Sequence, residues 1–412
     1  MTEGESTMKH VLAVLSASLS LGLFAGPTVS DVTVVPSANS PKIEVRYKLD
    51  QDAVVTVRFI VGGTDVPGEQ TQWIGGDVGQ KVLATSGDEC RSIYWAPDKE
   101  DWGEGGLPDF SSVVAVVSAW ALDAPPDYMV VDLVISNRVS YYASTNFIPG
   151  GVLDDMYKTN KMVFRKIPAK NVTWKSGLAA DGTSYYRPHR YLLLTNDYYI
   201  GIFEVTRAQS RCYCKRYETG NGAWRDYEDY PMRALAGIRY GEMLGNVDNL
   251  EPSATSDLGK FRALTGLSSA TLPTEAQWDY ACRGRSGDPA YWGSVTTESS
   301  ALRAFTSTSG GKASTGPQKV GQLLPNSYGL YDMLGNASEC CLDYKYSWAG
   351  DTVNVTTNMY IDKATAGVGT HIMMGGSYAN DIWYARNSCY FGVAEDGAWN
   401  AGYRIVVDAI VK

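Results

Sequence analysis

The stretch that decides the fold is GLYDMLGNASECC, residues 329–341. Its middle places two carboxylates, Asp332 and Glu339, seven residues apart, with the turn-forming pair Gly335-Asn336 between them. Glycine readily adopts the backbone angles that such a turn needs. Two like charges this close repel each other unless a cation lies between them or both side chains point into solvent. The stretch is therefore either a solvated acidic turn or a cation-binding loop.

Residues 1–25 are typical of a secretory signal peptide, with Met8 as an alternative start. From Met8 the chain has a basic start, about a dozen apolar or small residues, and Ala25 before Gly26-Pro27, which is the pattern of an export signal. A buried N-terminal helix is the alternative interpretation. No later segment approaches the ~20 apolar residues that a membrane-spanning helix needs. We therefore expect a protein that is secreted or lies in the periplasm or cell envelope, with no transmembrane segment.

The composition is that of a globular protein of two or three domains. The chain has 412 residues, of which 44% are hydrophobic and 20% are charged, and its net charge is −9. No cluster of Lys and Arg is dense enough to follow a phosphate backbone, so we expect no nucleic-acid partner. The three histidines are His10, His189 and His371. Because His10 lies in the leader, the remaining chain cannot build a three-histidine metal centre, and we expect His189 and His371 to be surface or packing residues.

The N-terminal part predicts an immunoglobulin- or fibronectin-like β-sandwich over residues 31–136. KIEVRYKL (42–49), AVVTVRFIV (53–61) and SVVAVVSAWAL (112–122) show alternating or β-branched patterns, and turn residues separate them. Since no catalytic side chains gather here, a binding or spacer role is the default. DAPPDY (123–128) resembles a linker, but a strand-like run follows it at once, so we expect the domain boundary within residues 136–155.

The rest of the chain is rich in Gly, Trp and Tyr, with two credible helices. One follows Thr206, and the other begins after Thr274, whose side chain can cap the free backbone N–H groups. The segments that identify this region occur in order along the chain: YYIGIFEVTRAQ (198–209), LPTEAQWDYACRGR (272–285), NSYGLYDMLGNASE (326–339), and GGSY followed by AGYRIV (375–406).

These segments resemble the formylglycine-generating enzyme, or sulfatase-modifying factor, family over about residues 155–410. The resemblance implies a mixed fold class for the whole chain: an all-β sandwich is followed by an α+β domain that is a variant of the C-type lectin fold. Such a domain has little regular secondary structure, two helices and a twisted antiparallel sheet.

The resemblance also implies a structural calcium ion at the opening stretch. Its ligands would be the side chains of Asp332 and Glu339 and the carbonyls of Gly335 and Ala337. This mixture of carboxylate and carbonyl oxygens is what Ca²⁺ prefers. The family's second calcium site would fall between Trp292 and Gly321, where acidic and Asn residues are too few, so we do not expect it.

Copper is not expected. Family oxidases hold copper with two cysteines shortly after the GGSY segment, and counting onward places Asn380 and Ala385 at those positions. Neither can replace a thiolate, so no catalytic residue is assigned. The related iron-dependent branch needs several histidines. The chain has seven cysteines, and the resemblance implies Cys282 and Cys389 as a disulfide pair.

We therefore predict a non-catalytic, calcium-stabilised module that binds an extracellular protein or a small ligand. Residues 377–400 are rich in Tyr, Trp, Asn and Asp, a mixture that suits adaptable binding surfaces, although packing in the core is the alternative for some of them. One alternative function is a formylglycine-generating oxidase acting on exported sulfatase-like proteins, and another is a retroelement-diversified lectin-fold receptor. The expected ligand contacts are Tyr378, Asn380, Asp381, Trp383, Arg386 and Trp399.

Overall fold

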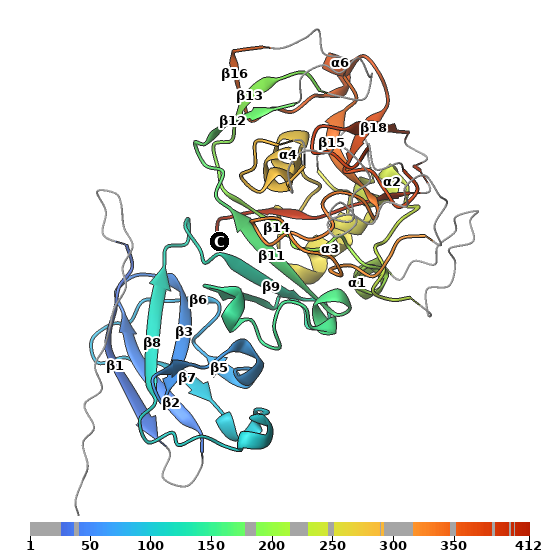
Figure 1. Ribbon diagram of the computed structural model, residues 1–412. Helices are drawn as coiled ribbons and strands as arrows, with labels where there is room; N and C mark the ends of the chain where they lie inside the picture. Colours follow the sequence, from blue (N-terminus) through green and yellow to red (C-terminus); the bar gives the residue numbers. More distant parts are fainter. Residues whose placement is uncertain are drawn as a thin grey trace, which may run out of the picture. The chain divides into compact units, whose positions relative to one another are not determined.

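A computed structural model shows a chain that divides into two compact units (Figure 1). The first unit comprises Met1–Asp127, Ser140–Val152 and Ile410–Lys412, and the second comprises Tyr128–Val139 and Leu153–Ala409. The expected signal peptide lies outside the described residues. The structure describes residues 26–36, 41–177, 187–214, 230–245, 251–288, 290–291, 316–346, 352–380, 384–394, 397–398 and 400–412.

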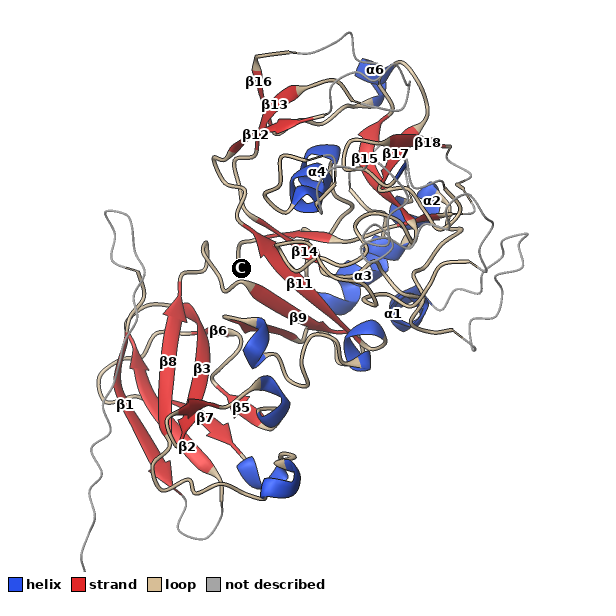
Figure 2. Ribbon diagram, in the orientation of Figure 1, coloured by secondary structure: helices blue, strands red, loops and turns tan. Residues whose placement is uncertain are grey.

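The first unit is built from antiparallel strands in two sheets (Figure 2). In β2 (Ile43–Leu49) every second residue is buried, as expected for a strand with one face on a core. One sheet has the order β1 (Val29–Pro36), β2, β7 (Arg91–Trp95), β5 (Ile74–Gly76). The other has the order β4 (Thr64–Asp65), β3 (Ala53–Val61), β6 (Lys81–Val82), and β8 (Val114–Trp120) also pairs with β3.

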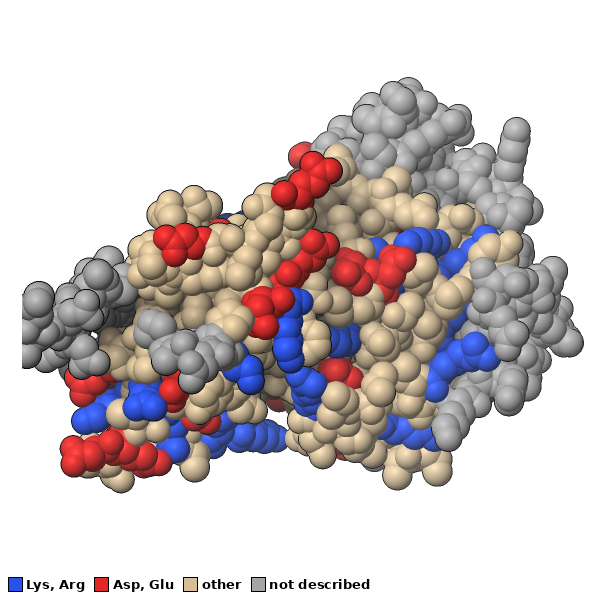
Figure 3. Space-filling view, turned by 90° about the horizontal axis from the view of Figure 1, so that it is seen from below, with Lys and Arg blue, Asp and Glu red and all other residues tan. Residues whose placement is uncertain are grey.

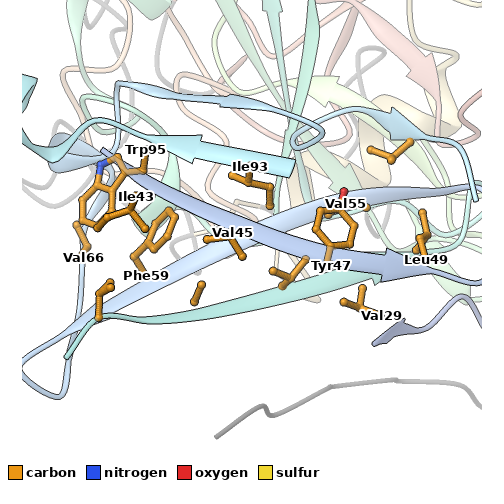
Figure 4. Close-up of a cluster of buried hydrophobic side chains, with 14 of the residues drawn as sticks. Val29, Ile43, Val45, Tyr47, Leu49, Val55, Phe59, Val66, Ile93 and Trp95 are labelled. Carbon is orange, nitrogen blue, oxygen red and sulfur yellow. The ribbon is translucent and has the colours of Figure 1, made fainter. Parts of the chain in front are cut away.

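Residues from both sheets form a single hydrophobic cluster in this unit (Figure 4). Phe59 of β3 and Trp95 of β7 stack with ring centroids 4.4 Å apart. Such a pair contributes about 0.5–1.5 kcal/mol beyond the burial of its area. Tyr47 and Ile93 of the same cluster are fully buried. The two sheets are therefore held together by apolar packing between their facing sides.

Two crossings between the units, after residues 139 and 152, lie within the expected boundary of residues 136–155, and an earlier one precedes β9 (Tyr128–Asp132). This strand pairs antiparallel with β11 (Lys161–Ile167) of the second unit, so the chain first leaves the first unit at Asp127, within the linker-like segment 123–128. The chain then returns to the first unit over Ser140–Val152. A strand belongs to the unit in which its backbone hydrogen bonds are made, and its local pattern does not reveal that partner.

The second unit has three small sheets and short helices, so the expectation of a β-rich domain with few helices is confirmed. One sheet has five strands, and those that lie wholly in this unit follow the order β9, β11, β14 (Tyr198–Gly201), β20 (Val406–Asp408). Another runs β18 (Tyr390–Val393), β17 (His371–Met374), β15 (Ser338–Tyr344), β19 (Ala401–Gly402). The third runs β12 (Thr173–Ser176), β13 (Arg190–Leu193), β16 (Val355–Thr357).

Five α-helices are described in this unit, and the two expected from the sequence are among them. These two are α1 (Arg207–Cys214) and α4 (Glu275–Arg283). The others are α2 (Tyr240–Leu244), α3 (Asp257–Thr265) and α6 (Lys363–Ala366). The elements of the chain not yet named are β10 (Val139–Tyr142) and the 3₁₀ turns η1 (Gly68–Gln70), η2 (Pro97–Lys99), η3 (Gly103–Gly105), η4 (Thr145–Phe147) and η5 (Asp155–Lys158), of which η1 to η4 belong to the first unit. No helix of the described residues is long and apolar enough to cross a membrane.

Helix α4 is defined at both ends by its sequence. The Thr274 side chain accepts a hydrogen bond from the Gln277 N–H, and the Gln277 side chain accepts one from the Thr274 N–H, which forms a capping box. At the other end Gly284 adopts a left-handed conformation, which suits glycine. Trp278 on this helix is fully buried and reaches the candidate site described below.

Candidate functional site

The turn over residues 332–339 is buried, so the interpretation of a solvated acidic turn is wrong. Asp332 and Glu339 are 2% and 1% exposed. Asp332, Gly335 and Asn336 all have positive φ angles, which tightens the chain before it enters β15. The Gly335 N–H donates to the Gly375 carbonyl at 2.9 Å. The turn therefore brings two carboxylates into the interior, where each needs compensation.

An internal arginine supplies a cation for Glu339. Arg404 is fully buried, and its Nη2 lies 2.8 Å from Glu339 Oε1. The Trp278 indole N–H donates to Glu339 Oε2 at 2.7 Å. Arg404 also donates to the carbonyls of Gly201 and Tyr331, both at 2.8 Å. The guanidinium therefore joins the turn to β14 and to the segment that precedes the turn.

A third buried carboxylate, Glu204, joins this cluster and was missed by sequence reasoning. It accepts hydrogen bonds from the Ala337 N–H at 2.8 Å and from the Asn336 side chain at 2.5 Å. Burial raises the pKa of Glu204 well above its usual range, and the nearby charges of Asp332 and Glu339 raise it further. No feature of the neighbouring sequence marks this glutamate as a partner of the turn. The only available signal was that it lies in FEVT, part of one of the segments that resemble the family.

Asp332 is held differently from Glu339. Its Oδ2 accepts a hydrogen bond from the Gly321 N–H at 2.6 Å. Burial raises the pKa of Asp332 to about 6, although this hydrogen bond and the charge of Arg404 oppose the change. Three buried carboxylates thus surround one guanidinium, so the cluster carries excess negative charge when all three are ionised. Additional protons or a cation would remove that excess.

The donor set fits a calcium ion at Asp332 better than at Glu339. Both oxygens of Glu339 already accept N–H groups of Arg404, and Oε2 also accepts that of Trp278. Within the described part of the chain, no three His, Cys, Asp or Glu side chains are grouped as ligands for a metal ion. An ion at the turn would therefore depend on Asp332 and on backbone oxygens. The stretch considered for the second calcium site, residues 292–321, lies mostly outside the described residues.

The positions expected for copper ligands contain no sulfur. Ser377 Oγ donates to Asn380 Oδ1 at 2.7 Å and accepts a hydrogen bond from Asn400 Nδ2 at 2.8 Å. Ala385 is fully buried. The side chain of Asn380 is thus part of a local hydrogen-bond network, and Ala385 is part of the core.

The implied disulfide is not found in the structure. Cys282 and Cys389 are both fully buried, but no bond joins them. Cys282 belongs to α4, which packs against β12, β15 and β17, whereas Cys389 directly precedes β18. Burial alone does not bring the two Cβ atoms to the separation of about 3.5–4.5 Å that a disulfide requires.

The expected ligand surface is only partly supported. Tyr378 is 1% exposed, so its assignment as a surface contact is wrong; its N–H donates to the Asn336 carbonyl at 2.6 Å, which places it against the buried turn. Asn380 and Arg386 are half-buried and can still be reached from outside. The predicted contacts Asp381, Trp383 and Trp399 lie outside the described residues.

His371 is a packing residue, as expected. Its ring stacks on Tyr240 with centroids 3.6 Å apart and lies 3.8 Å from the ring of Tyr344. Its Nδ1 lies 3.1 Å from the Leu342 carbonyl oxygen. His189 is half-buried.

A second buried charge cluster lies at the start of α4. Nε and Nη2 of the Arg187 guanidinium donate hydrogen bonds to the two carboxylate oxygens of Glu275, at 2.7 and 2.8 Å. Asp343 accepts hydrogen bonds from the Glu275 N–H and the Ile361 N–H. Burial raises the pKa of Asp343 to about 7, and the neighbouring Glu275 carboxylate adds to the increase. This cluster connects α4 to β15.

The molecular surface has a mixed charge pattern. On the face shown in Figure 3, the basic and acidic side chains of the described residues lie interspersed, with no continuous basic track.

Comparisons with known proteins extend these observations. Residues 157–409 match the family model described as the sulfatase-modifying factor enzyme 1-like domain. The formylglycine-generating enzyme of Thermomonospora curvata is 31% identical over 157 residues, which are 34% of this chain and 50% of that enzyme. The formylglycine-generating enzyme of Streptomyces coelicolor is 30% identical over 156 residues, covering 34% of this chain and 46% of that enzyme.

This chain thus spans about half the length of the curated relatives that it matches. Among solved structures, Treponema denticola variable protein 1 is 20% identical, with 60% of this chain and 95% of that chain covered and a TM-score of 0.45. A likeness at this level supports no argument about function.

Proposed function

Because this chain belongs to the family of sulfatase-modifying factor enzyme 1-like domains, we propose that it is an exported, non-catalytic member of the family. In this proposal the second unit binds a protein or a small ligand and is stabilised by calcium. The first unit, an immunoglobulin- or fibronectin-like sandwich, serves as a binding or spacer domain. The family match confirms the resemblance recognised in the sequence. The proposal itself consists of three points: the catalytic activity has been lost, the second unit binds calcium, and the chain is exported.

One observation carries the proposal that oxidase chemistry has been lost. The positions that correspond to the copper-binding cysteines hold Asn380 and Ala385. Cu(I) is a soft ion that selects thiolate ligands, and neither an amide nor a methyl group can replace them. The fully buried Ala385 leaves no room for a different ligand at that position without repacking.

A peptide assay tests this point directly. The purified chain, loaded with copper, is incubated with a peptide carrying a sulfatase-type cysteine motif, and the product is analysed by mass spectrometry. We expect no formylglycine, while the Thermomonospora curvata enzyme, run in parallel, supplies the positive control. Conversion of the cysteine by this chain would establish the alternative function, a formylglycine-generating oxidase.

The calcium part of the proposal rests on the excess negative charge around Arg404. A cation near Asp332 would neutralise charge that otherwise requires protonation of Glu204 or Asp332. A ligand that binds only the folded state stabilises it by about 2.7 kcal/mol at a hundredfold excess over Kd. We therefore expect chelation to lower the melting temperature of the second unit and added calcium to restore it.

Substitution of one carboxylate separates specific binding from general effects of calcium. Asp332→Asn should remove most of the response to chelator, whereas Asp98→Asn, at an exposed position of the first unit, should leave it intact. Glu339→Gln is a poorer probe because it also breaks the ion pair with Arg404. A melting curve of the unmodified chain that is the same in chelator and in calcium would end the calcium proposal.

The ligand surface that remains in the proposal includes Asn380 and Arg386. Both residues are half-buried, so each is partly exposed to solvent and partly packed against the protein. The partner remains an extracellular protein or a small ligand. Retroelement-diversified lectin-fold receptors are the second alternative. Sequencing residues 377–400 in many isolates of the producing organism would show whether variation concentrates there, and an invariant segment would exclude that alternative.

A further inference from the structure

The first unit exposes two aromatic side chains on one face of a sheet. Trp73 is 53% exposed and Tyr94 is 50% exposed. Trp73 directly precedes β5, and its carbonyl accepts a hydrogen bond from the Ala96 N–H, while Tyr94 of β7 pairs with Gly75 of β5. Their neighbours Ile74 and Trp95 point into the core, so both exposed rings lie on the outer face. Diagonal cross-strand neighbours of this kind are about 7–8 Å apart.

The backbone at Trp73 is held in position by a buried carboxylate beneath it. The buried carboxylate of Glu100 accepts hydrogen bonds from the N–H groups of Gln72 and Trp73, at 3.1 and 2.8 Å, and lies 3.3 Å from the indole nitrogen of Trp95. The backbone that carries Trp73 is therefore tied to the core. Rigid placement lowers the entropy that a ligand would otherwise lose on binding.

Glycine at position 76 makes room for the other ring. A Cβ atom there would clash with the Ser92 carbonyl oxygen and lie 3.2 Å from Cδ2 of Tyr94, so the Tyr94 ring lies over the Gly76 end of β5, and Gly75 separates it from Trp73. At Gly75 a Cβ would meet no atom within 4 Å. The space between the rings thus has a floor of bare backbone.

Charged and polar side chains border the two rings. Lys99 Nζ lies 4.9 Å from the centroid of the Trp73 ring. Beside Tyr94, the side chain of Arg46 is 52% exposed and forms an ion pair with Glu44 at 2.9 Å. Glu44 also accepts a hydrogen bond from Ser92 Oγ at 3.0 Å. Hydrogen-bonding groups therefore surround a small apolar surface.

We propose that Trp73 and Tyr94 form a platform that binds a polysaccharide chain. A pyranose ring has an apolar C–H face, which matches an aromatic ring, and hydroxyl groups at its edge, which match the side chains of Arg46, Glu44 and Lys99. Sites of this composition, with apolar rings for contact and a few placed polar groups for orientation, are those that bind small molecules.

The size of the platform argues against a protein partner. A buried aromatic side chain covers about 150–250 Å², so two half-exposed rings offer on the order of 200 Å². A stable protein interface needs about 800 Å² on each partner. The edge strand β5 has only three residues, which is short for pairing with a strand of another chain.

Affinity electrophoresis of the full chain tests the proposal. The chain is run in native gels containing soluble polysaccharides, both neutral (a β-glucan, a xylan) and acidic (a polygalacturonate). We expect at least one of them to retard the chain. Trp73→Ala and Tyr94→Ala should each weaken that binding at least tenfold, with unchanged circular dichroism and melting temperature. Retardation by the acidic polymer alone would assign the binding energy to Lys99 and Arg46 as well as the rings.

Matched controls come from the same unit. Leu83 and Leu107 are as exposed as the two aromatic residues, at 58% and 52%, and Leu83→Ala and Leu107→Ala should bind like the unmodified chain. The proposal is overturned if no gel retards the chain, or if the leucine variants lose as much affinity as the aromatic ones. Self-association that Trp73→Ala abolishes, without polysaccharide binding, would instead identify a second copy of the chain as the occupant.

Discussion

Replacing Arg404 with methionine would remove the only guanidinium that directly contacts Glu339 in the described structure. The ion pair is fully buried, with side chains 0% and 1% exposed. Breaking a buried pair by removing one partner costs about 3–5 kcal/mol, because the remaining charge has no compensation. The carbonyls of Gly201 and Tyr331 would also lose their hydrogen bonds. We therefore expect Arg404→Met to lower the free energy of unfolding by at least about 3 kcal/mol.

The matched control is an ion pair on the surface. Arg58 lies 3.0 Å from Asp65, with side chains 40% and 46% exposed, and Arg58→Met should cost no more than about 1 kcal/mol. Urea unfolding of all variants, in chelator and then in calcium, would be followed by circular dichroism and tryptophan fluorescence. The transition of the second unit should respond to Arg404→Met.

A double variant distinguishes the contribution of the Arg404–Glu339 ion pair to stability from that of general packing. In Arg404→Met/Glu339→Gln the uncompensated carboxylate is gone, so part of the lost stability should return, and the coupling energy between the two sites should be favourable. If Arg404→Met and Arg58→Met destabilise the chain equally, the charge cluster around Arg404 contributes no stability and the argument for an additional cation there also fails.

Three further outcomes are expected. The pKa of Asp343 is raised from 3.8 to about 7, so the protonated carboxyl contributes stability on the order of 4 kcal/mol. That contribution is complete below about pH 4 and is lost as the pH rises from there through 7. Urea unfolding at pH 4 and pH 8 should show this decrease, and Asp343→Asn should reduce it. Tyr378→Ala truncates a core side chain and should lower the free energy of unfolding by about 3–5 kcal/mol, whereas Asn380→Ala should leave the melting temperature nearly unchanged. If Asn380→Ala were the more destabilising of the two, the assignment of Tyr378 to the core would be wrong. Thr274→Ala removes a helix cap and should cost about 1 kcal/mol in the same denaturation assay, with a null effect contradicting the capping role.

Several features of the fold could be predicted from the sequence because their causes are local. The alternation in residues 42–49 predicted β2, since a strand with one buried face repeats every two residues. Thr274 marked the start of α4, since a cap acts within a few residues of the helix end. The ordered segments between residues 198 and 406 identified the family. These signals do not depend on which distant part of the chain packs against them.

The partners of the buried charges were decided only by the tertiary structure. Glu204 meets the turn of residues 332–339, and Arg404 meets Glu339, across 132 and 65 positions of the sequence. Tyr378 reads as a binding residue by its type but packs against the same turn. The strand at 128–132 has the pattern of the first unit and the hydrogen bonds of the second. A sequence states which side chains are polar or apolar, but contacts between distant segments decide which of them are buried and which pair. Many different pairings of segments are compatible with the same local sequence pattern.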